Sequence, residues 1–235
     1  MLVSVIIPTT PKEKPMLDKC LKALDRSTYR KLEIIVVDEG KERSEQRNIG
    51  IRMATGDCIL YLDVDQQVSM YLIAECVCFI QNGYDAIYIP EEITTKGFFA
   101  YLRNWERQFY TATAIDCVRF MRKDVCPEFD EELKGPEDSC HDRRVKGERI
   151  TSRSNIFHED NVTVLSYFKK KAYYAKSMKR FSEKYPNDKV LKFWWRCLGV
   201  FFEQGKWKRV LMRPDLFLLV MMLIFIRGVI YATKS

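Results

Sequence analysis

Hydrophobic and polar positions form short alternating blocks along the first 90 residues. Four apolar runs have the length of buried strands, at residues 2–7, 32–37, 58–62 and 85–89. Between them, apolar residues recur every three or four positions, which is the pattern of an amphipathic helix. Strands that alternate with helices predict a mostly parallel sheet covered by helices, and therefore an α/β fold.

The third apolar run ends in two carboxylates, Asp63 and Asp65, and Gln67 follows two residues later. In an open α/β sheet, ligands bind outside the carboxyl ends of the strands. Divalent cations that are held together with phosphates prefer oxygen ligands such as these. The run therefore indicates a metal and phosphate site, although the two aspartates could also simply end a strand and begin a helix.

A second apolar pattern lies near the C-terminus. Residues 215–233 are largely apolar, and a helix of this length is roughly 28 Å long, close to the thickness of a bilayer core. Arg227 interrupts it and could reach the interface, or it could indicate a helix that lies flat or packs against a partner. Residues 191–202 interleave aromatic residues with Lys192 and Arg196, as interfacial helices do. The alternative is a pair of ordinary core helices.

Charge divides the chain in two. Residues 1–160 carry 23 Lys and Arg against 28 Asp and Glu, whereas residues 161–235 carry 16 against 4. We therefore expect one domain at residues 1–165 and a basic, aromatic helical extension at residues 166–235 that ends in an apolar membrane helix. Such a basic extension suggests nucleic acid or an anionic membrane as its partner. No nucleic-acid recognition motif is present, which favours the membrane.

The side of the membrane follows from the basic residues that precede the apolar helix. They are Lys206, Lys208, Arg209 and Arg213. By the positive-inside rule, they place the domain at the cytoplasmic side of the cell membrane. The N-terminus shows no signal-peptide pattern. The eight cysteines contain no Cys-x-x-Cys pair, so neither a zinc cage nor a disulfide framework is indicated.

Several motifs together resemble the family 2 glycosyltransferases of the GT-A fold. They are residues 4–9, 33–38, 47–50, 55–57 and 63–65, followed by residues 129–133, Glu137 and Asp138 with Arg144 and Gly147, His158, and residues 167–174. The resemblance covers roughly residues 2–190, and the order and spacing of the motifs make it specific. It implies a Rossmann-like GT-A sheet that binds a nucleotide sugar.

The resemblance also implies a donor site. Pro8, Thr9, Asp38, Arg47 and Asp63 would line the nucleotide pocket, and Asp38 would bind the base. Asp63 and Asp65 are similar to the family's Asp-x-Asp, which holds Mg²⁺ or Mn²⁺ against the diphosphate, with Gln67 and His158 as further ligands. The cation acts as a Lewis acid that neutralises the leaving nucleoside diphosphate. Taken alone, Asp38 could be a turn residue and His158 a structural histidine.

On the acceptor side, Asp138 matches the general base of inverting family members. It would deprotonate an acceptor hydroxyl as that hydroxyl attacks the anomeric carbon. Glu137 and Arg144 would contact the acceptor. The pair of Glu137 and Asp138 could instead only begin a helix, because acidic residues are favoured there.

The chain departs from the family pattern between Asp38 and Arg47. Only residues 39–46 intervene, where the family usually has another helix and strand. We therefore expect the sheet to lack one edge strand and the nucleotide pocket to be more open on that side. After Asp138, the chain has Ser139 and Cys140 where many relatives carry an acidic and an apolar residue, so the acceptor contacts should differ.

Together these features predict an inverting, metal-dependent glycosyltransferase that uses a UDP- or GDP-linked sugar and a lipid-borne acceptor. Asp138 favours a hydroxyl acceptor on a lipid-linked saccharide or glycolipid, whereas Gln67 resembles the polyprenyl-phosphate sugar synthases, whose acceptor is a phosphate. A catalytically inactive membrane scaffold is a further alternative. A nucleotidyltransferase is disfavoured because residues 8–12 contain no glycine.

Overall fold

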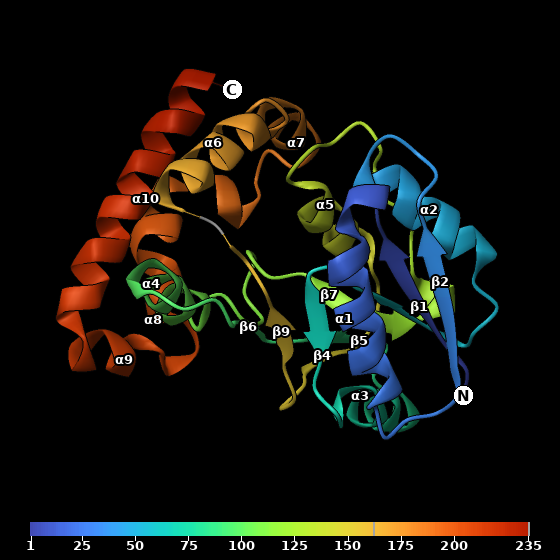
Figure 1. The fold of residues 1–235 in the computed structure, drawn as a ribbon. Helices are drawn as coiled ribbons and strands as arrows, with labels where there is room; N and C mark the ends of the chain where they lie inside the picture. The colour runs from blue at the N-terminus through green and yellow to red at the C-terminus, as the bar shows by residue number, and fades with distance from the viewer. Residues whose placement is uncertain (162, 235) are drawn as a thin grey trace.

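The computed structural model describes residues 1–161 and 163–234. It contains a six-stranded sheet, a three-stranded sheet and a group of C-terminal helices beside them (Figure 1). The strands are β1 (Val3–Pro8), β2 (Leu32–Val37), β3 (Cys58–Tyr61), β4 (Gln66–Val68), β5 (Ala86–Tyr88), β6 (Glu91–Ile93), β7 (Val118–Arg122), β8 (Arg149–Thr151) and β9 (Ile156–His158).

The helices alternate with these strands and then follow them. The α-helices are α1 (Lys14–Asp25), α2 (Arg43–Met53), α3 (Leu72–Gln81), α4 (Phe98–Arg107), α5 (Glu137–Arg144), α6 (Val164–Ala175), α7 (Met178–Lys184), α8 (Val200–Phe202), α9 (Trp207–Met212) and α10 (Pro214–Lys234). The shorter turns are the 3₁₀ segments η1 (Pro11–Glu13), η2 (Lys123–Val125), η3 (Lys189–Leu191) and η5 (Glu203–Gly205), and the π-turn η4 (Trp195–Gly199).

The large sheet has the strand order β2-β1-β3-β7-β5-β8. β1 pairs in parallel with β2 and β3, and β5 pairs in parallel with β8. β7 runs antiparallel to both of its neighbours. The predicted α/β fold is therefore confirmed, and β2 forms an edge, as expected from the short connection at residues 39–46. The small sheet has the order β4-β9-β6.

Side chains alternate across β1 because successive residues of a strand point to opposite faces. Val3, Val5 and Ile7 pack into a core cluster with residues of α1 and α3. Ile6 packs on the other face with residues of α2. A Cβ atom at Gly50 of α2 would lie 2.3 Å from Ile6 Cγ2, so glycine permits this close approach of helix and sheet. Helices thus cover both faces of the sheet.

The C-terminal helices form a third layer that we call the helical layer. Its core contains residues of α4, α8 and α10, and α10 also packs against α6. α4 belongs to the first 165 residues, so the helical layer shares its core with the segment before it. The division of the chain at residue 165 stays a prediction.

The helix predicted at residues 191–202 is present from residue 193 to residue 202, but the π-turn η4 widens its centre. A Cβ atom at Gly199 would lie 2.6 Å from the ring of Trp195, and a wider turn accommodates such packing. Phe201 is buried in the helical layer, whereas Trp194 and Phe202 are exposed.

Arg227 lies inside the helical layer. Its guanidinium donates to Glu106 Oε1 at 2.6 Å and to the hydroxyl of Tyr167 at 2.9 Å. Among the alternatives left open by the sequence, Arg227 therefore packs against partners, and these partners belong to the same chain.

Candidate functional site

The carboxyl ends of three adjacent parallel strands meet at one edge of the large sheet. β1 lies between β2 and β3, so the residues that follow these strands emerge side by side. The amide of Thr9 donates to the carbonyl of Val37 at 2.9 Å, and Gln46 Nε2 donates to the carbonyl of Thr9 at 2.8 Å. The predicted donor residues gathered at this edge are Pro8, Thr9, Asp38 and Asp63.

Arg47 is buried behind this edge and joins two carboxylates from distant parts of the chain. Its Nη2 donates to Asp63 Oδ1 at 2.8 Å, and its Nη1 donates to Asp138 Oδ1 at 2.6 Å. The guanidinium carbon lies 5.0 Å from the ring centre of Tyr61 and 4.9 Å from that of Phe129. A cation in such a dry environment requires charged partners. Arg47 thus couples the predicted donor-side carboxylate to the predicted catalytic one.

Asn48 fixes the segment that leads to α5. Its Oδ1 accepts a hydrogen bond from the amide of Phe129 at 2.6 Å, and its Nδ2 donates to the carbonyl of Phe129 at 3.0 Å. Arg47 and Asn48 are therefore two successive residues of α2 that together position Asp138. Sequence reasoning found Asn48 only as part of a motif, because its partner is 81 residues away.

The charges around Asp63 keep it ionised. Burial alone would raise the pKa of Asp63, but the guanidiniums of Arg47 and Arg43 hold that pKa well below its usual value. Arg43 Nη1 lies 3.6 Å from Asp63 Oδ1. An ionised carboxylate is the form that binds a cation.

Asp65 and His158 lie next to each other although they are 93 residues apart in the sequence. Asp65 Oδ2 lies 3.2 Å from His158 Nε2, and His158 Nδ1 lies 3.5 Å from Glu91 Oε2. The pairing of β4 with β9 creates this contact by placing Gln66 opposite His158. Sequence reasoning predicted His158 at this site and missed Glu91, since β6 and β9 meet only in the tertiary structure.

The two glutamines after Asp65 have different environments. Gln66 Oε1 accepts a hydrogen bond from the amide of Asp63 at 2.9 Å, and Gln66 Nε2 donates to Glu91 Oε1 at 3.2 Å. Gln67 pairs with Phe157 and points to the other face of the small sheet, because side chains alternate along a strand. Gln66 thus organises the turn, and Gln67 as a metal ligand stays a prediction.

The residues at this edge include donor groups of the kind that a divalent cation binds. Asp65 Oδ1 is buried and has no hydrogen-bond partner in the described part of the chain, and such an oxygen is costly unless a partner completes it. Carboxylate and amide oxygens suit Mg²⁺ or Mn²⁺. Within residues 1–161 and 163–234, no three His, Cys, Asp or Glu side chains converge closely enough to hold a metal ion by themselves. Asp63 faces Arg47 instead of Asp65.

Asp138 lies in the first turn of α5, after Gly135, whose φ of +110° favours glycine. Its side chain is 29% exposed although its partner Arg47 is only 1% exposed. The neighbouring Glu137 accepts a hydrogen bond from the amide of Gly135. Burial, followed by the negative charge of Asp138, raises the pKa of Glu137 to about 7. Of these two acids, Asp138 is the one that lines the cavity described next.

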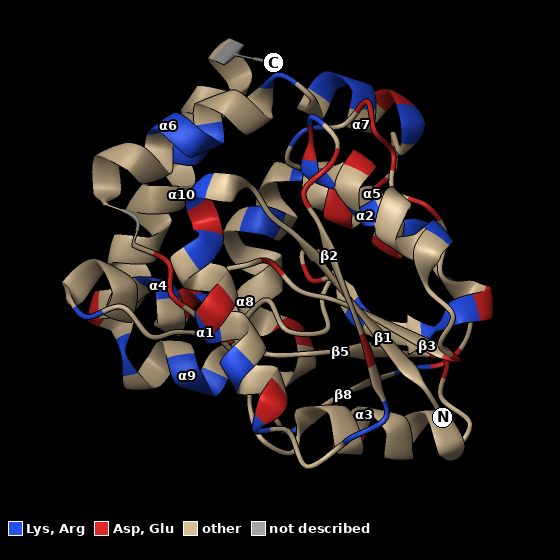
Figure 2. Ribbon diagram, turned by 45° about the vertical axis from the view of Figure 1, so that its right-hand side comes forward, with Lys and Arg blue, Asp and Glu red and all other residues tan. Residues whose placement is uncertain are grey.

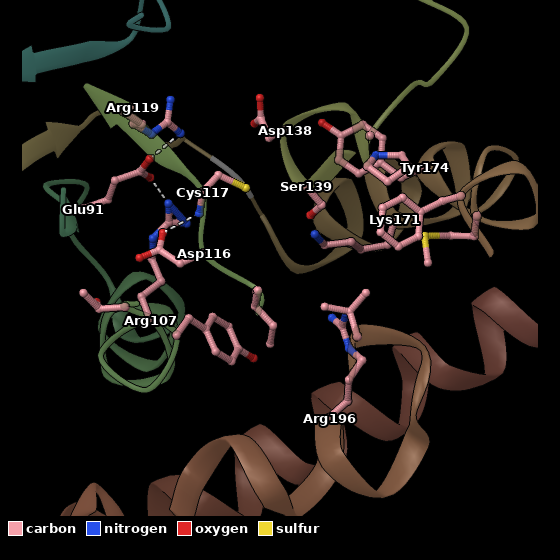
Figure 3. A pocket seen from close by; sticks show the side chains of 18 of the residues that line it. Glu91, Arg107, Asp116, Cys117, Arg119, Asp138, Ser139, Lys171, Tyr174 and Arg196 are labelled. Atoms are coloured by element: carbon pink, nitrogen blue, oxygen red, sulfur yellow. Dashed lines mark hydrogen bonds and ion pairs between the residues drawn. The ribbon is translucent and has the colours of Figure 1, made fainter. Parts of the chain in front are cut away.

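A cavity of about 310 Å³ separates the sheets from the helical layer. Figure 3 shows Arg119 and Glu91 on one side of it and Ser139, Lys171 and Tyr174 on the other. Glu91 forms ion pairs with both Arg107 and Arg119. These two arginines and Glu91 were not predicted. Charged residues in the otherwise apolar strand β7 are a signal for Arg119, although the same strand also contains Arg122.

Arg144 lies outside this cavity. It is exposed on α5, and its Nη2 donates to the carbonyl of Glu128. The structure therefore brings Arg47, Asp63 and Asp138 together, and Asp65 with His158, but it does not bring Arg144 to them. Its contact with an acceptor stays a prediction.

Residues 39–127 match the family model described as glycosyl transferase family 2. This range contains Arg47, Asp63, Asp65 and Gln67, and it ends before Asp138 and His158. The match thus covers the predicted metal-binding motif but not the predicted base. No curated protein sequence is similar to this chain.

Solved structures of glycosyltransferases share the fold. A mannosyltransferase from Pyrobaculum calidifontis, PcManGT, in complex with GDP-Man and Mn²⁺, has a TM-score of 0.64 at 16% identity and covers 99% of this chain and 86% of its own. TarS from S. aureus has a TM-score of 0.52 at 18% identity and covers 76% of this chain. A shorter TarS, residues 1–349 with UDP-GlcNAc, has a TM-score of 0.50 at 16% identity and covers 74% of this chain.

The chain spans 40% of the length of TarS and 66% of the shorter form. At these identities, the comparison establishes the fold alone, which is GT-A. The GT-A fold expected from the sequence motifs is thereby confirmed.

Proposed function

We propose that this protein is an inverting glycosyltransferase that moves a sugar from a UDP- or GDP-linked donor to a lipid-borne acceptor at the cytoplasmic face of the cell membrane. The observation that carries the proposal is the contact of Arg47 with both Asp63 and Asp138. One buried guanidinium sets the distance between the carboxylate of the donor site and the carboxylate of the acceptor site. The family match of residues 39–127 supports the donor side.

The donor site lies at the carboxyl ends of β1, β2 and β3. Thr9 and Asp38 emerge beside Asp63 and stand where a nucleotide binds in α/β sheets. The similar structures, TarS with UDP-GlcNAc and PcManGT with GDP-Man, support both nucleotides as candidates.

A divalent cation would be held by Asp63 and Asp65, with Gln67 and His158 as further ligands. When bound, it neutralises charge that develops on the leaving diphosphate. Arg43 and Arg47 keep Asp63 ionised and fixed in place. Glu91 Oε2 lies 3.5 Å from Nδ1, the other ring nitrogen of His158.

Asp138 performs the proton step. The acceptor hydroxyl oxygen attacks the anomeric carbon, its proton passes to an Asp138 oxygen, and the bond from the anomeric carbon to the diphosphate oxygen breaks. The nucleoside diphosphate leaves, and the configuration at the anomeric carbon inverts because attack and departure occur on opposite faces of the sugar. Arg47 orients Asp138 from behind, so the carboxylate stays aimed at the cavity.

The exterior of the helical layer supports the membrane part of the proposal. Pro214–Thr233 of α10 has a mean hydropathy of 2.3 and is only 28% buried. Exposed apolar residues lie on α10, on α9 and on residues 193–202; they include Phe193, Trp194, Leu211, Met212, Leu218, Met222 and Phe225. Basic residues of α6 and α9 lie close to this surface (Figure 2). Apolar area flanked by Lys and Arg is the pattern of a protein that binds anionic lipid.

A transfer assay tests the proposal. Membranes that contain the expressed chain are supplied with radiolabelled UDP- and GDP-sugars, and label in the lipid extract is measured. Asp138→Asn should lower transfer by about 10²–10⁴-fold, the usual contribution of a general base. The matched control is Asp124→Asn, an exposed carboxylate paired with Arg122, which should keep wild-type transfer.

Near-normal transfer by Asp138→Asn would contradict the hydroxyl mechanism. The same preparation tests the location, since the chain should stay with the membrane fraction after a high-salt wash. Recovery of the chain in the soluble fraction would contradict membrane binding.

A further inference from the structure

Two cavities of this structure share a wall. The first is the cavity of about 310 Å³ that contains Asp138, and the second has a volume of about 630 Å³. Both are lined by Met178, Val190, Arg196 and Tyr231. The second cavity lies between α7, residues 190–197 and the C-terminal half of α10. A ligand that fills both would reach from the acceptor carboxylate to the apolar exterior of the helical layer.

The second cavity has an apolar lining with a basic margin. Its apolar residues include Leu191, Phe193, Cys197 and Ile224, and its basic residues are Lys179, Arg196 and Arg227. Phe193 is 53% exposed, so this cavity adjoins the surface that we assign to the membrane. Its volume lies within the range of about 300–1,000 Å³ that is typical of small-ligand sites.

The charges at the shared wall are unbalanced. Figure 3 shows Lys171 of α6 and Arg196 of η4 extending into the first cavity. In the described part of the chain, no carboxylate forms an ion pair with either side chain, although Arg107 and Arg119 share Glu91 and Arg227 has Glu106.

The surroundings of Lys171 oppose its positive charge. Lys171 has the rings of Tyr167 and Tyr174 at 5.4 and 5.6 Å from its Nζ. Burial, with added repulsion from Arg103, Arg227 and Arg196, lowers the pKa of Lys171 well below its ordinary value. Uncompensated like charges at a partly buried site are costly, and an anion bound there removes the cost.

We propose that Lys171 and Arg196 bind the phosphate group of an anionic lipid acceptor, whose apolar chain occupies the second cavity. This inference rests on the proposed function and specifies its acceptor as a phosphate-bearing lipid. Arg and Lys are the residues that bind phosphate oxygens by charge-assisted hydrogen bonds. The apolar chain enters beside Phe193 and α10, and the polar end points towards Asp138.

The test is a binding titration of the purified full chain with three probes: farnesyl phosphate, farnesol and inorganic phosphate. We expect the Kd of farnesyl phosphate to be at least about tenfold lower than that of either other probe. Farnesol lacks the charged contacts of the phosphate, and inorganic phosphate lacks the contacts of the apolar chain. Equal binding of farnesol would show that the charge is not recognised and would overturn the proposal. Equal binding of inorganic phosphate would identify a free anion as the ligand and would also overturn it.

Charge-removal variants locate the site. Lys171→Gln with Arg196→Gln should weaken farnesyl phosphate binding by about tenfold or more. The matched controls are Lys169→Gln and Lys192→Gln, which change exposed lysines of the same two segments that line neither cavity. Unchanged binding in the double variant would overturn the proposal.

A second variant addresses the apolar chain without removing a charge. A Cβ atom at Gly228 would meet only Phe193 Cε2, at 3.8 Å, an ordinary contact. Gly228→Leu therefore adds an apolar side chain at the wall of the second cavity, where its Cβ has room, and it should reduce the advantage of farnesyl phosphate over inorganic phosphate. An unchanged advantage would overturn the proposal.

Nucleotide binding separates this proposal from the proposed function. Binding of GDP or UDP with Mn²⁺ but not of farnesyl phosphate would overturn the lipid subsite alone. Absence of nucleotide binding would contradict the proposed function itself.

Discussion

Two buried arginines, Arg47 and Arg227, lie in different parts of this molecule and have different surroundings. Arg47 is held by Asp63 and Asp138, whose side chains are 12% and 29% exposed. Arg227 is held by Glu106, whose side chain is 0% exposed. The carboxylates of the first cluster can still reach a ligand, whereas the carboxylate of the second cannot. A buried charge therefore indicates a functional site only where its partners remain accessible.

The two clusters also differ in what they join. Arg47 connects the edge of the sheet to α5 across 91 residues, so it relates Asp63 to the helix that carries Asp138. Arg227 connects α10 to α4 and α6, so it holds the helical layer together. Residues of the Arg47 cluster should therefore affect both activity and stability, and residues of the Arg227 cluster mainly stability.

The largest effect is expected from Arg47→Gln. Removing one partner of a buried ion pair costs about 3–5 kcal/mol. In this variant, two carboxylates lose their partner, Asp63 and Asp138. The free energy of unfolding, measured with urea, should fall by that amount, and sugar transfer should fall with it at temperatures where the variant is folded. Arg52→Gln is the control, because Arg52 pairs with Glu128 at the surface, and its effect should stay within about 0.5 kcal/mol.

A smaller effect is expected from Arg227→Gln. Glu106 keeps Arg103 and the hydroxyl of Tyr110 as partners, so the loss should be about 1–3 kcal/mol, the cost of leaving a buried polar group with fewer partners. Binding of nucleotide with Mn²⁺ should be unchanged. Loss of nucleotide binding in Arg227→Gln, with the protein folded, would contradict the division of roles between the two clusters.

A third effect concerns pH and the Arg47 cluster. Burial, with the charge of Arg47, lowers the pKa of His141 from 6.5 to about 3, and His141 stacks on Phe129 with ring centres 4.0 Å apart. Between pH 3 and 6.5, the unfolded chain binds a proton at this residue that the folded chain does not, so stability is lost as the pH falls.

The variant His141→Gln measures this contribution. As the pH falls from 6.5 towards 3, the free energy of unfolding of the wild type should decrease by about 1.4 kcal/mol per pH unit more than that of the variant. Parallel curves would contradict a buried neutral histidine beside Arg47. When Arg227→Gln is compared with the wild type in the same way, the difference between their free energies of unfolding should not change with pH.

The parts of the fold that could be predicted from the sequence depend on local pattern. The runs at residues 2–7 and 58–62 form strands that are buried on both faces, as continuous apolar segments of that length usually are. The run at residues 32–37 forms the edge strand β2, which leaves Ile34 and Val36 exposed. Asp63 and Asp65 were found for the same reason, since they end such a run. Asp138 was found only through the family resemblance.

The remaining features depend on contacts between distant segments. Glu91, Arg107 and Arg119 come from β6, α4 and β7, and no periodicity relates them. The partner of Arg227 is 121 residues away, so the sequence left its position open. The antiparallel insertion of β7 between β3 and β5 likewise follows from pairing that is not encoded locally.

The measurement that tests the central claim most directly is calorimetric titration of the purified protein with UDP and with GDP, each with and without Mn²⁺. We predict that one of the two nucleotides binds only when Mn²⁺ is present. Asp65→Asn should lose this binding, and Asp138→Asn should keep it. Failure of both nucleotides to bind the wild-type protein with Mn²⁺ would contradict a nucleotide-sugar donor site at Asp63 and Asp65.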